Sequence, residues 1–462
     1  MPSIFGMLNV GRVAIMTQQK AIAVTGNNIA NVNTPGYSRQ RLNMEQNEPV
    51  LYQGGLMGSG VKANRTIQRI YDRFLRAQIN NEEQGLGRWQ AEKEALEKVE
   101  LMFDEVSGYG LNNAMGKFWN SWQDLSNNPG GHVERTTLLA DTQVLTGTFN
   151  KLYTDVQKVS QDIDLNIKGT IQEVNRLTEQ LADLNTKIAR VEVNEQAANS
   201  YRDNRDLLLK ELSEIIEVES FEDSDGYLTV SVGAGKPLVD NTNSWELTSG
   251  VNASGFQDIF WVDSSGATIN ITSDLKGGKL KGWTEARDVI IPDYLNSLDA
   301  LAQGVINDVN GLHSSGYALD GSQNDLFTGT SASDMAVAEN IAGNSDLIAA
   351  SSTSGGIPGD NSNAIAIANL QNSLQINGNS TSPDDYYNSI ISDVGSSVLN
   401  ASVRFDHQTA IVARMDNYRE EVSGVSLDEE MVNLVKYQHA YDAAAKVISS
   451  ADELLSTLIN MI

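Results

Sequence analysis

The chain of 462 residues carries a formal net charge of −27 at pH 7, has no cysteine, and is 40% hydrophobic but only 6% aromatic. This length can bury the cores of two or more domains, and the negative charge disfavours a nucleic-acid partner because it would repel the phosphates. The same charge disfavours an anionic membrane surface, and no apolar run is long enough to span a bilayer, so we expect no membrane insertion.

The first predicted element is an amphipathic helix over the first thirty residues. Apolar residues recur there at every seventh position, the spacing of a narrow coiled-coil seam: Leu8, Ile15, Ile22 and Ile29. A weaker stripe lies between them at Gly11, Gln18, Thr25 and Val32. The segment lacks a basic region followed by a continuous apolar stretch and a cleavage site, so we expect no cleaved secretory signal.

A run of turn-forming residues ends this helix. Asn27, Asn28 and Asn31 tolerate left-handed backbone and can bond to their own main chain, and Pro35 with Gly36 predicts a turn. An extended arm is expected to follow. The glycines at Gly54, Gly55, Gly58 and Gly60 then predict a flexible connector, which is typical of an assembly arm more than of a catalytic loop.

The middle of the chain predicts a helical body. Residues 66–103 have a helical pattern with a break expected at Gly85 and Gly87, and residues 118–125 predict a short aromatic helix.

The strongest helical pattern covers residues 156–191. A helix of that length needs a parallel neighbour, and we expect it to pack against residues 207–216 and 290–312.

A sharp change in composition follows. Residues 223–278 are rich in Gly, Ser, Asn and Thr and predict strands at 227–232, 259–262 and 268–271. Residues 321–363 predict loops or irregular structure.

The last part of the chain returns to helix. Helices are expected to resume near Pro383, with Gly424 as a joint before a terminal helix. Its apolar stripe continues to the last residues at Leu427, Met431, Leu434, Tyr441, Ile448, Leu455 and Leu458. The two terminal stripes predict helices that pair with each other and with other subunits. The alternative is that both stripes pack only on the core of their own chain.

The predicted fold class is mainly α with a β insertion, in which the terminal helices pair as a coiled coil and a long helical bundle forms the middle. We expect residues 1–60 and 424–462 to form a terminal assembly domain. Residues 61–220 and 285–423 are expected to form the helical domain, and residues 221–284 the inserted β domain.

The sequence offers no convincing catalytic or metal site. The four histidines do not form a helical zinc motif: His132, His313, His407 and His439. We expect His313 to be a packed residue at a helix end. Residues 233–237 lack the spacing of a phosphate-binding loop, and residues 223–226 and 320–325 lack the final glutamate of a calcium-binding EF-hand. No catalytic residue, cofactor or metal is therefore predicted.

Several segments carry a family resemblance. Residues 27–37, Asn-Asn-Ile-Ala-Asn-Val-Asn-Thr-Pro-Gly-Tyr, resemble the N-terminal signature of the rod, hook and hook-associated proteins of the bacterial flagellum, and residues 428–455 resemble the ending of these axial proteins. Residues 309–321 and Ser38, Arg39 and Gln40 are similar to the hook-associated members.

This resemblance implies a non-enzymatic subunit of the extracellular flagellum, exported through the flagellar type III channel. It implies self-association into a ring at the hook–filament junction. The implied partners are the hook protein, the second junction protein, and an export chaperone on the C-terminal region. A hook or distal rod protein, or an adhesin that binds through the β insertion, remains an alternative.

Overall fold

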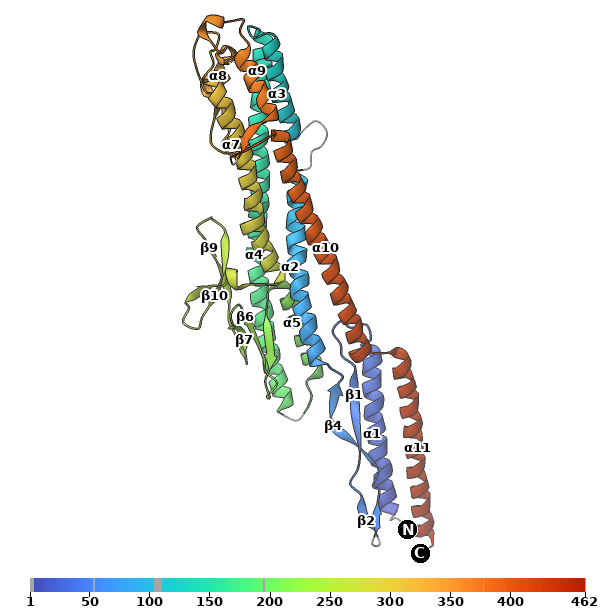
Figure 1. Cartoon of the computed structure of the whole chain (residues 1–462). Helices are drawn as coiled ribbons and strands as arrows, with labels where there is room; N and C mark the ends of the chain where they lie inside the picture. The colour runs from blue at the N-terminus through green and yellow to red at the C-terminus, as the bar shows by residue number, and fades with distance from the viewer. Residues whose placement is uncertain (1–3, 53–54, 104–109, 194–195, 377, 462) are drawn as a thin grey trace.

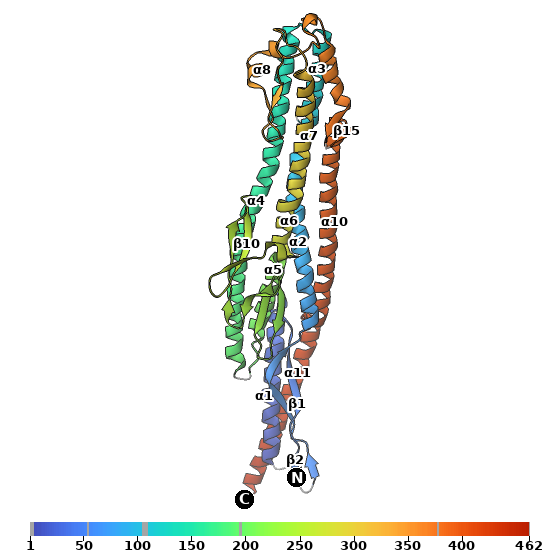
Figure 2. The same cartoon turned by 60° about the vertical axis from the view of Figure 1, so that its left-hand side comes forward.

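The computed structural model describes residues 4–52, 55–103, 110–193, 196–376 and 378–461. The molecule is long and narrow, with both termini at one end (Figure 1). Long helices run side by side through most of its length, and small sheets lie on one flank of this bundle (Figure 2). We call residues 70–423 the body, and α1, α11 and the strands between α1 and α2 the terminal unit. The predicted fold class is confirmed.

The helices named in the argument have the following bounds: α1 Ile4–Ala30, α2 Arg73–Phe103, α3 Leu111–Asn127, α4 His132–Glu192, α5 Asn199–Ile215, α6 Gly278–Glu285, α7 Ile291–His313, α8 Glu339–Gly343, α9 Ser362–Asn369, α10 Pro383–Ser423 and α11 Leu427–Asn460. A π-helical turn, Ala286–Ile290, joins α6 to α7.

The strands form six antiparallel sheets among the described residues. In the terminal unit they are β1 Gln40–Gln46, β2 Val50–Tyr52, β3 Gly55–Met57 and β4 Val61–Arg69. The β insertion contains β5 Glu219–Glu222, β6 Leu228–Val232, β7 Lys236–Asp240, β8 Asn243–Ser244, β9 Leu247–Val251, β10 Gln257–Val262 and β11 Thr268–Asn270. Two short pairs lie nearer the far end of the body: β12 Phe327–Thr328 with β13 Ala336–Val337, and β14 Leu374–Ile376 with β15 Asn379–Thr381.

The body is organised around α4, which packs against α3, α5 and α7, while α2 packs against α10. The predicted neighbours of the long helix are confirmed. The helix is 61 residues long and begins at His132, well before the pattern that starts at Val156. Thr and Gly residues weaken the helical signal over its first turns, but Leu138, Leu145 and Phe149 there are fully buried at helical spacings.

The break predicted at Gly85 and Gly87 is wrong, because α2 continues through both residues. A Cβ atom on Gly87 would lie 1.9 Å from the main-chain oxygen of Glu214, and one on Gly282 would lie 2.2 Å from that of Arg88. Gly87 and Gly282 therefore allow α2 to approach α5 and α6 closely, which outweighs the helix propensity lost at one glycine.

The β insertion forms a four-stranded sheet in the order β5-β6-β7-β8 and a three-stranded sheet in the order β11-β10-β9. The three predicted strands are confirmed as β6, β10 and β11. Asp164 of α4 accepts bonds of 2.7 Å from the Gln257 main-chain N–H and from the guanidinium of Arg287, which is fully buried. These bonds fix the smaller sheet to the helical bundle.

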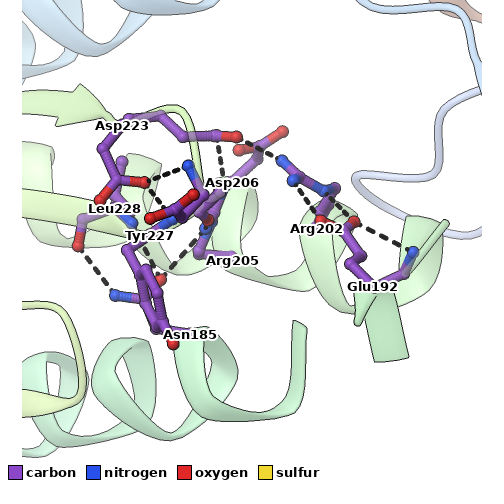
Figure 3. A network of polar contacts seen from close by, with 12 residues as sticks. Asn185, Glu192, Arg202, Arg205, Asp206, Asp223, Tyr227 and Leu228 are labelled. Carbon is purple, nitrogen blue, oxygen red and sulfur yellow. Dashed lines mark hydrogen bonds and ion pairs between the residues drawn. The ribbon is translucent and has the colours of Figure 1, made fainter. Parts of the chain in front are cut away.

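The larger sheet is joined to α5 by the polar network in Figure 3. Arg205, which is fully buried, donates to Asn185 Oδ1 at 3.1 Å, to the Gly226 oxygen at 2.8 Å and to Glu222 Oε2 at 2.5 Å. Arg202 holds Glu192 with two bonds of 2.7 and 2.8 Å. This end of α5 is thus fixed between the C-terminal end of α4 and the first hairpin of the sheet.

His313 is the last residue of α7 and is fully buried. Its Nε2 accepts the Ala349 N–H at 2.9 Å, so Nδ1 carries the proton and donates to the Asn324 oxygen. Burial lowers the pKa of His313 from its ordinary value of 6.5 to about 4. The expected role at a helix end is confirmed.

We predict that the neutral His313 makes the body sensitive to acid. The unfolded chain binds the proton near pH 6.5 and the folded chain near pH 4, so the free energy of unfolding falls between these values, by up to about 3 kcal/mol. The free energy of unfolding of His313→Gln, measured with urea, should be lower than that of the parent at pH 7. It should also change less than that of the parent between pH 7 and pH 4. His407→Gln, at an exposed position, is the control; an unchanged pH dependence in His313→Gln would contradict the prediction.

The extended arm expected after α1 is present as β1. The predicted flexible connector is wrong at Gly55, which begins β3, whereas Gly58 and Gly60 lie between β3 and β4. Strands β1 and β4 pair from Gln40 with Arg69 to Gln46 with Val61, with a bulge between Leu42 and Met44. Leu42 is buried against Ala21 and Val24 of α1, so a short apolar face fixes the strands on the helix. Gly54 lies outside the described residues. Strand β4 begins at Val61, directly after the boundary predicted at residue 60, and pairs across it with β1. The three-part domain division stays a prediction.

Candidate assembly interface at the terminal helices

Helices α1 and α11 pack along each other in opposite directions. Gly11 lies against Ile448, where an added Cβ would be 2.6 Å from Ile448 Cγ1, and Asn28 bonds to Glu430. The residue numbers rise along α1 as they fall along α11, so the pair is antiparallel and both chain ends lie at its far tip (Figure 1).

The predicted stripe of α1 is only half buried. Leu8, Ile15, Ile22 and Ile29 are all of intermediate exposure. The buried positions of α1 are instead small or polar, apart from Val24: Gly11, Thr17, Ala21, Thr25 and Asn28. Their counterparts on α11 are Ala444 and Ala451. Small side chains let the two backbones approach, and Gly11 of the weaker stripe lies at a close contact with Ile448 and the Ala444 main chain.

The predicted stripe of α11 divides into two groups. Leu434, Tyr441, Ile448 and Leu455 are half buried. Leu427, Met431 and Leu458 are 46%, 59% and 50% exposed. Further exposed apolar side chains lie on the same two helices or, for the last one, directly after α11: Phe5, Met16, Val432, Val435, Val447, Leu454, Ile459 and Met461. The pair therefore leaves apolar surface uncovered in the single chain, as an assembly interface would.

Asn28 is the polar centre of the terminal unit and is 1% exposed. Its Nδ2 donates to the Gln40 oxygen at 2.9 Å and to Glu430 Oε2 at 3.0 Å. Its Oδ1 accepts the Gln40 N–H at 3.0 Å and the Tyr37 hydroxyl at 2.8 Å. One side chain thus fixes α1 to β1, α11 and the turn between them, and all its hydrogen-bonding groups are used.

The turn itself is built from the predicted residues. Asn31 bonds to Asn27, Pro35 is exposed, and Gly36 has φ +77° beside Leu207 of α5. Burial and the charges of Asp203 and Glu430 raise the pKa of Tyr37 to about 12, so its hydroxyl keeps the proton that it donates to Asn28. Asn27, Asn31, Pro35 and Gly36 therefore shape the turn.

Arg39 fixes the start of α11. It donates to Glu430 Oε1 and to Glu429 Oε2, both at 2.7 Å, and its main-chain N–H donates to the Ser423 oxygen at 2.8 Å. Ser426 caps α11 by accepting the Glu429 N–H at 3.5 Å. The joint predicted at Gly424 is confirmed, since the residue lies between α10 and α11.

Buried charges join the terminal unit to the body. Arg69 of β4 donates to Asp203 Oδ1 at 3.1 Å and to Asp206 Oδ2 at 2.7 Å on α5. Burial alone would lower the pKa of Arg69, but Asp206, Tyr71 and Asp203 outweigh it and raise the pKa. Asp203 also accepts the Ser38 N–H at 3.2 Å.

This joint was not predicted from the sequence. The signal that could have found it is the repeat Arg202-Asp203-Asn204-Arg205-Asp206, which alternates basic and acidic residues near the start of a helix. Its arginines bind the β insertion and its aspartates bind the terminal unit.

No group of three or more His, Asp or Glu side chains in the described ranges is placed to hold a metal ion. Among the same residues, no helix is both long and apolar enough to cross a membrane.

Family models match both ends of the chain. Residues 8–37 match the flagella basal body rod protein model, and residues 418–461 match the C-terminal model of the flagellar basal body rod FlgEFG proteins. These matches cover most of α1, the turn after it and α11. The antiparallel terminal pair is thus that of an axial protein of the bacterial flagellum.

Residues 96–327 match the model of the flagellar hook-associated protein FlgK helical domain. Flagellar hook-associated protein 1 of Bacillus subtilis is 30% identical over 100% of this chain and 99% of its own length, and that of Escherichia coli is 24% identical over 98% and 99%. The chain belongs to the flagellar hook-associated protein 1 family. The flagellar hook junction protein FlgK from Burkholderia pseudomallei has a similar fold, with a TM-score of 0.68 at 15% identity over 75% of this chain and 100% of that chain.

Proposed function

We propose that this chain is a structural subunit that joins the hook to the filament of the bacterial flagellum. The observation that carries the proposal is the terminal pair, which is fixed by Asn28 and Arg39 within the chain yet exposes apolar side chains along both helices. The helical-domain match favours this role over that of a hook or distal rod protein, because it covers the body and not only the shared ends.

When the subunits assemble into a ring, neighbouring subunits cover the exposed faces of α1 and α11. Burial of apolar surface contributes about 25 cal/mol per Å² before ordering costs. The predicted stripe residues of α11 have two roles in this proposal. Leu434 and Ile448 hold α11 on α1, and Leu427, Met431 and Leu458 contact neighbouring subunits. The hook protein and the second junction protein are the proposed axial partners.

Export completes the proposal. The chain leaves through the flagellar type III channel and acts outside the cell. Until then, an export chaperone binds the C-terminal helix, whose exposed apolar side chains offer a groove-binding partner several anchors. Neither a catalytic group nor a cofactor is needed for this structural role.

The experiment that tests the function is deletion of the gene in its own bacterium. Electron microscopy of the cells and assay of flagellin in the medium should show complete hooks without filaments and flagellin lost outside. Absent hooks would indicate a rod or hook component instead, and normal filaments would contradict a junction role.

We predict that removal of residues 454–462 blocks incorporation but leaves the body folded. These residues include the exposed Leu454 and Leu458, whereas the body core lies far from this tip. The free energy of unfolding of the truncated chain should lie within about 1 kcal/mol of that of the parent, because few buried contacts are lost. It should fail to restore filaments in the deletion strain; normal filaments from it would show that the tip of α11 is not needed.

A further inference from the structure

The charge of the chain is distributed very unevenly. Residues 1–69 contain seven basic and two acidic residues, a formal charge of +5, and residues 424–462 contain two basic and six acidic residues, a formal charge of −4. The terminal unit is therefore close to neutral, and residues 70–423 carry a formal charge of −28. The negatively charged bodies of two copies repel each other, whereas their nearly neutral terminal units do not. Contact between copies is therefore favoured at the terminal unit.

Within the terminal unit, the two helices have opposite charge. Helix α1 contains no acidic residue, and its exposed face carries Arg12 and Lys20 beside the apolar Phe5 and Met16. Arg12 bonds only to Asn9 among the described residues.

Helix α11 contains six acidic residues, of which Glu429 and Glu430 already pair with Arg39. The exposed residues Asp442 and Glu453 fall on its outward face, together with Lys446 and the apolar Val435. The acidic residues of α11 that do not pair with Arg39 outnumber Lys436 and Lys446, so the net charge of this face is negative.

We propose that the outward face of α11 in one copy docks on the outward face of α1 in the next copy. This contact rests on the proposed function. Each face joins a few exposed apolar side chains to a net charge, which is positive on α1 and negative on α11. The occupant of the α11 face is thus a second copy of this chain.

The antiparallel pairing fixes the relative heights of the charges. Gly11 lies level with Ile448 and Asn28 with Glu430, so Asp442 lies level with Thr17 and Glu453 close to Gly6. A shift of one copy along the axis by four or five residues, about 7 Å at 1.5 Å per residue, brings Asp442 near Lys20 and Glu453 near Arg12. Exact alignment would need a shift of about three residues for the first pair and about six for the second, so the intermediate displacement leaves each pair about 2 Å out of level, within the reach of these side chains.

The contact is head-to-tail. The outward faces of α1 and α11 point away from each other, because the two helices meet through Gly11, Ala444 and Ala451. One contact uses the α11 face of one copy and the α1 face of the next, and leaves a free face at either end. Such a contact adds copies one after another around an axis instead of stopping at a dimer.

The test is a charge swap between two full-length chains in the deletion strain. Chain one carries Arg12→Glu and Lys20→Glu, and chain two carries Asp442→Lys and Glu453→Lys. Each chain alone places like charges at every contact and should yield about tenfold fewer filaments per cell. Both chains together restore opposite charges at every contact when they alternate, and should recover filaments.

Control variants reverse exposed charges on the body, Lys158→Glu and Asp162→Lys, and should keep filament numbers near those of the parent. Circular dichroism melting of each purified chain checks that it folds.

Full activity of either swapped chain alone would overturn the proposed contact, and so would failure of the two folded chains to restore filaments together. Failure of the junction role itself would appear earlier, as normal filaments in the strain without the gene.

Discussion

Asn28→Ala is expected to separate α11 from α1 while the body stays folded. The substitution removes four hydrogen bonds at a site that is 1% exposed and leaves the Gln40 main chain and the Glu430 carboxylate without this partner. Unsatisfied buried groups cost about 1 to 3 kcal/mol each, so we expect a loss of about 4 kcal/mol confined to the terminal unit. Hydrogen exchange should accelerate in α1 and α11 and not in α4.

Two matched variants make this test specific. Asn31→Ala removes bonds within the partly exposed turn and should cost less than about 1 kcal/mol. Asn28→Asp keeps the acceptor for Gln40 but loses the donor to Glu430 and adds a negative charge beside it, so it should resemble Asn28→Ala. Equal exchange rates in Asn31→Ala and Asn28→Ala would show that Asn28 is not the centre of the unit.

Arg69→Met is expected to release the terminal unit from the body. It leaves Asp203 and Asp206, whose side chains are each 6% exposed, without their shared cation. Breaking a buried ion pair by removing one partner costs about 3 to 5 kcal/mol. The free energy of unfolding should fall by this amount, and small-angle X-ray scattering should show a wider range of angles between the two parts.

A second variant separates lost charge balance from lost packing. Arg69→Met combined with Asp203→Asn and Asp206→Asn removes the stranded charges and should recover most of the stability. Lys62→Met on the same strand is exposed and should change stability by less than about 0.5 kcal/mol. If Arg69→Met behaves like Lys62→Met, the joint does not depend on this ion pair.

Periodicity was sufficient for the elements that bury one continuous face. The long helix within α4, the strands β6, β10 and β11, and the two terminal helices all follow from the spacing of apolar residues, because that spacing is the local cause of their burial. The Asn-rich turn and the joint at Gly424 follow from backbone chemistry in the same way.

The sequence by itself therefore determined that both ends are helices with apolar stripes separated from a helical body by a turn. Only the tertiary structure decided what Gly87, Asn28 and Arg69 do: one lets a helix approach its neighbour, and the others bind partners that lie far away in the sequence. A close backbone contact or a buried polar bond depends on two segments at once, and neither segment alone carries a periodic signal for it. For the same reason, the stripes predicted an interface, but only the packed pair separated the residues that hold it together from those left exposed for a neighbour.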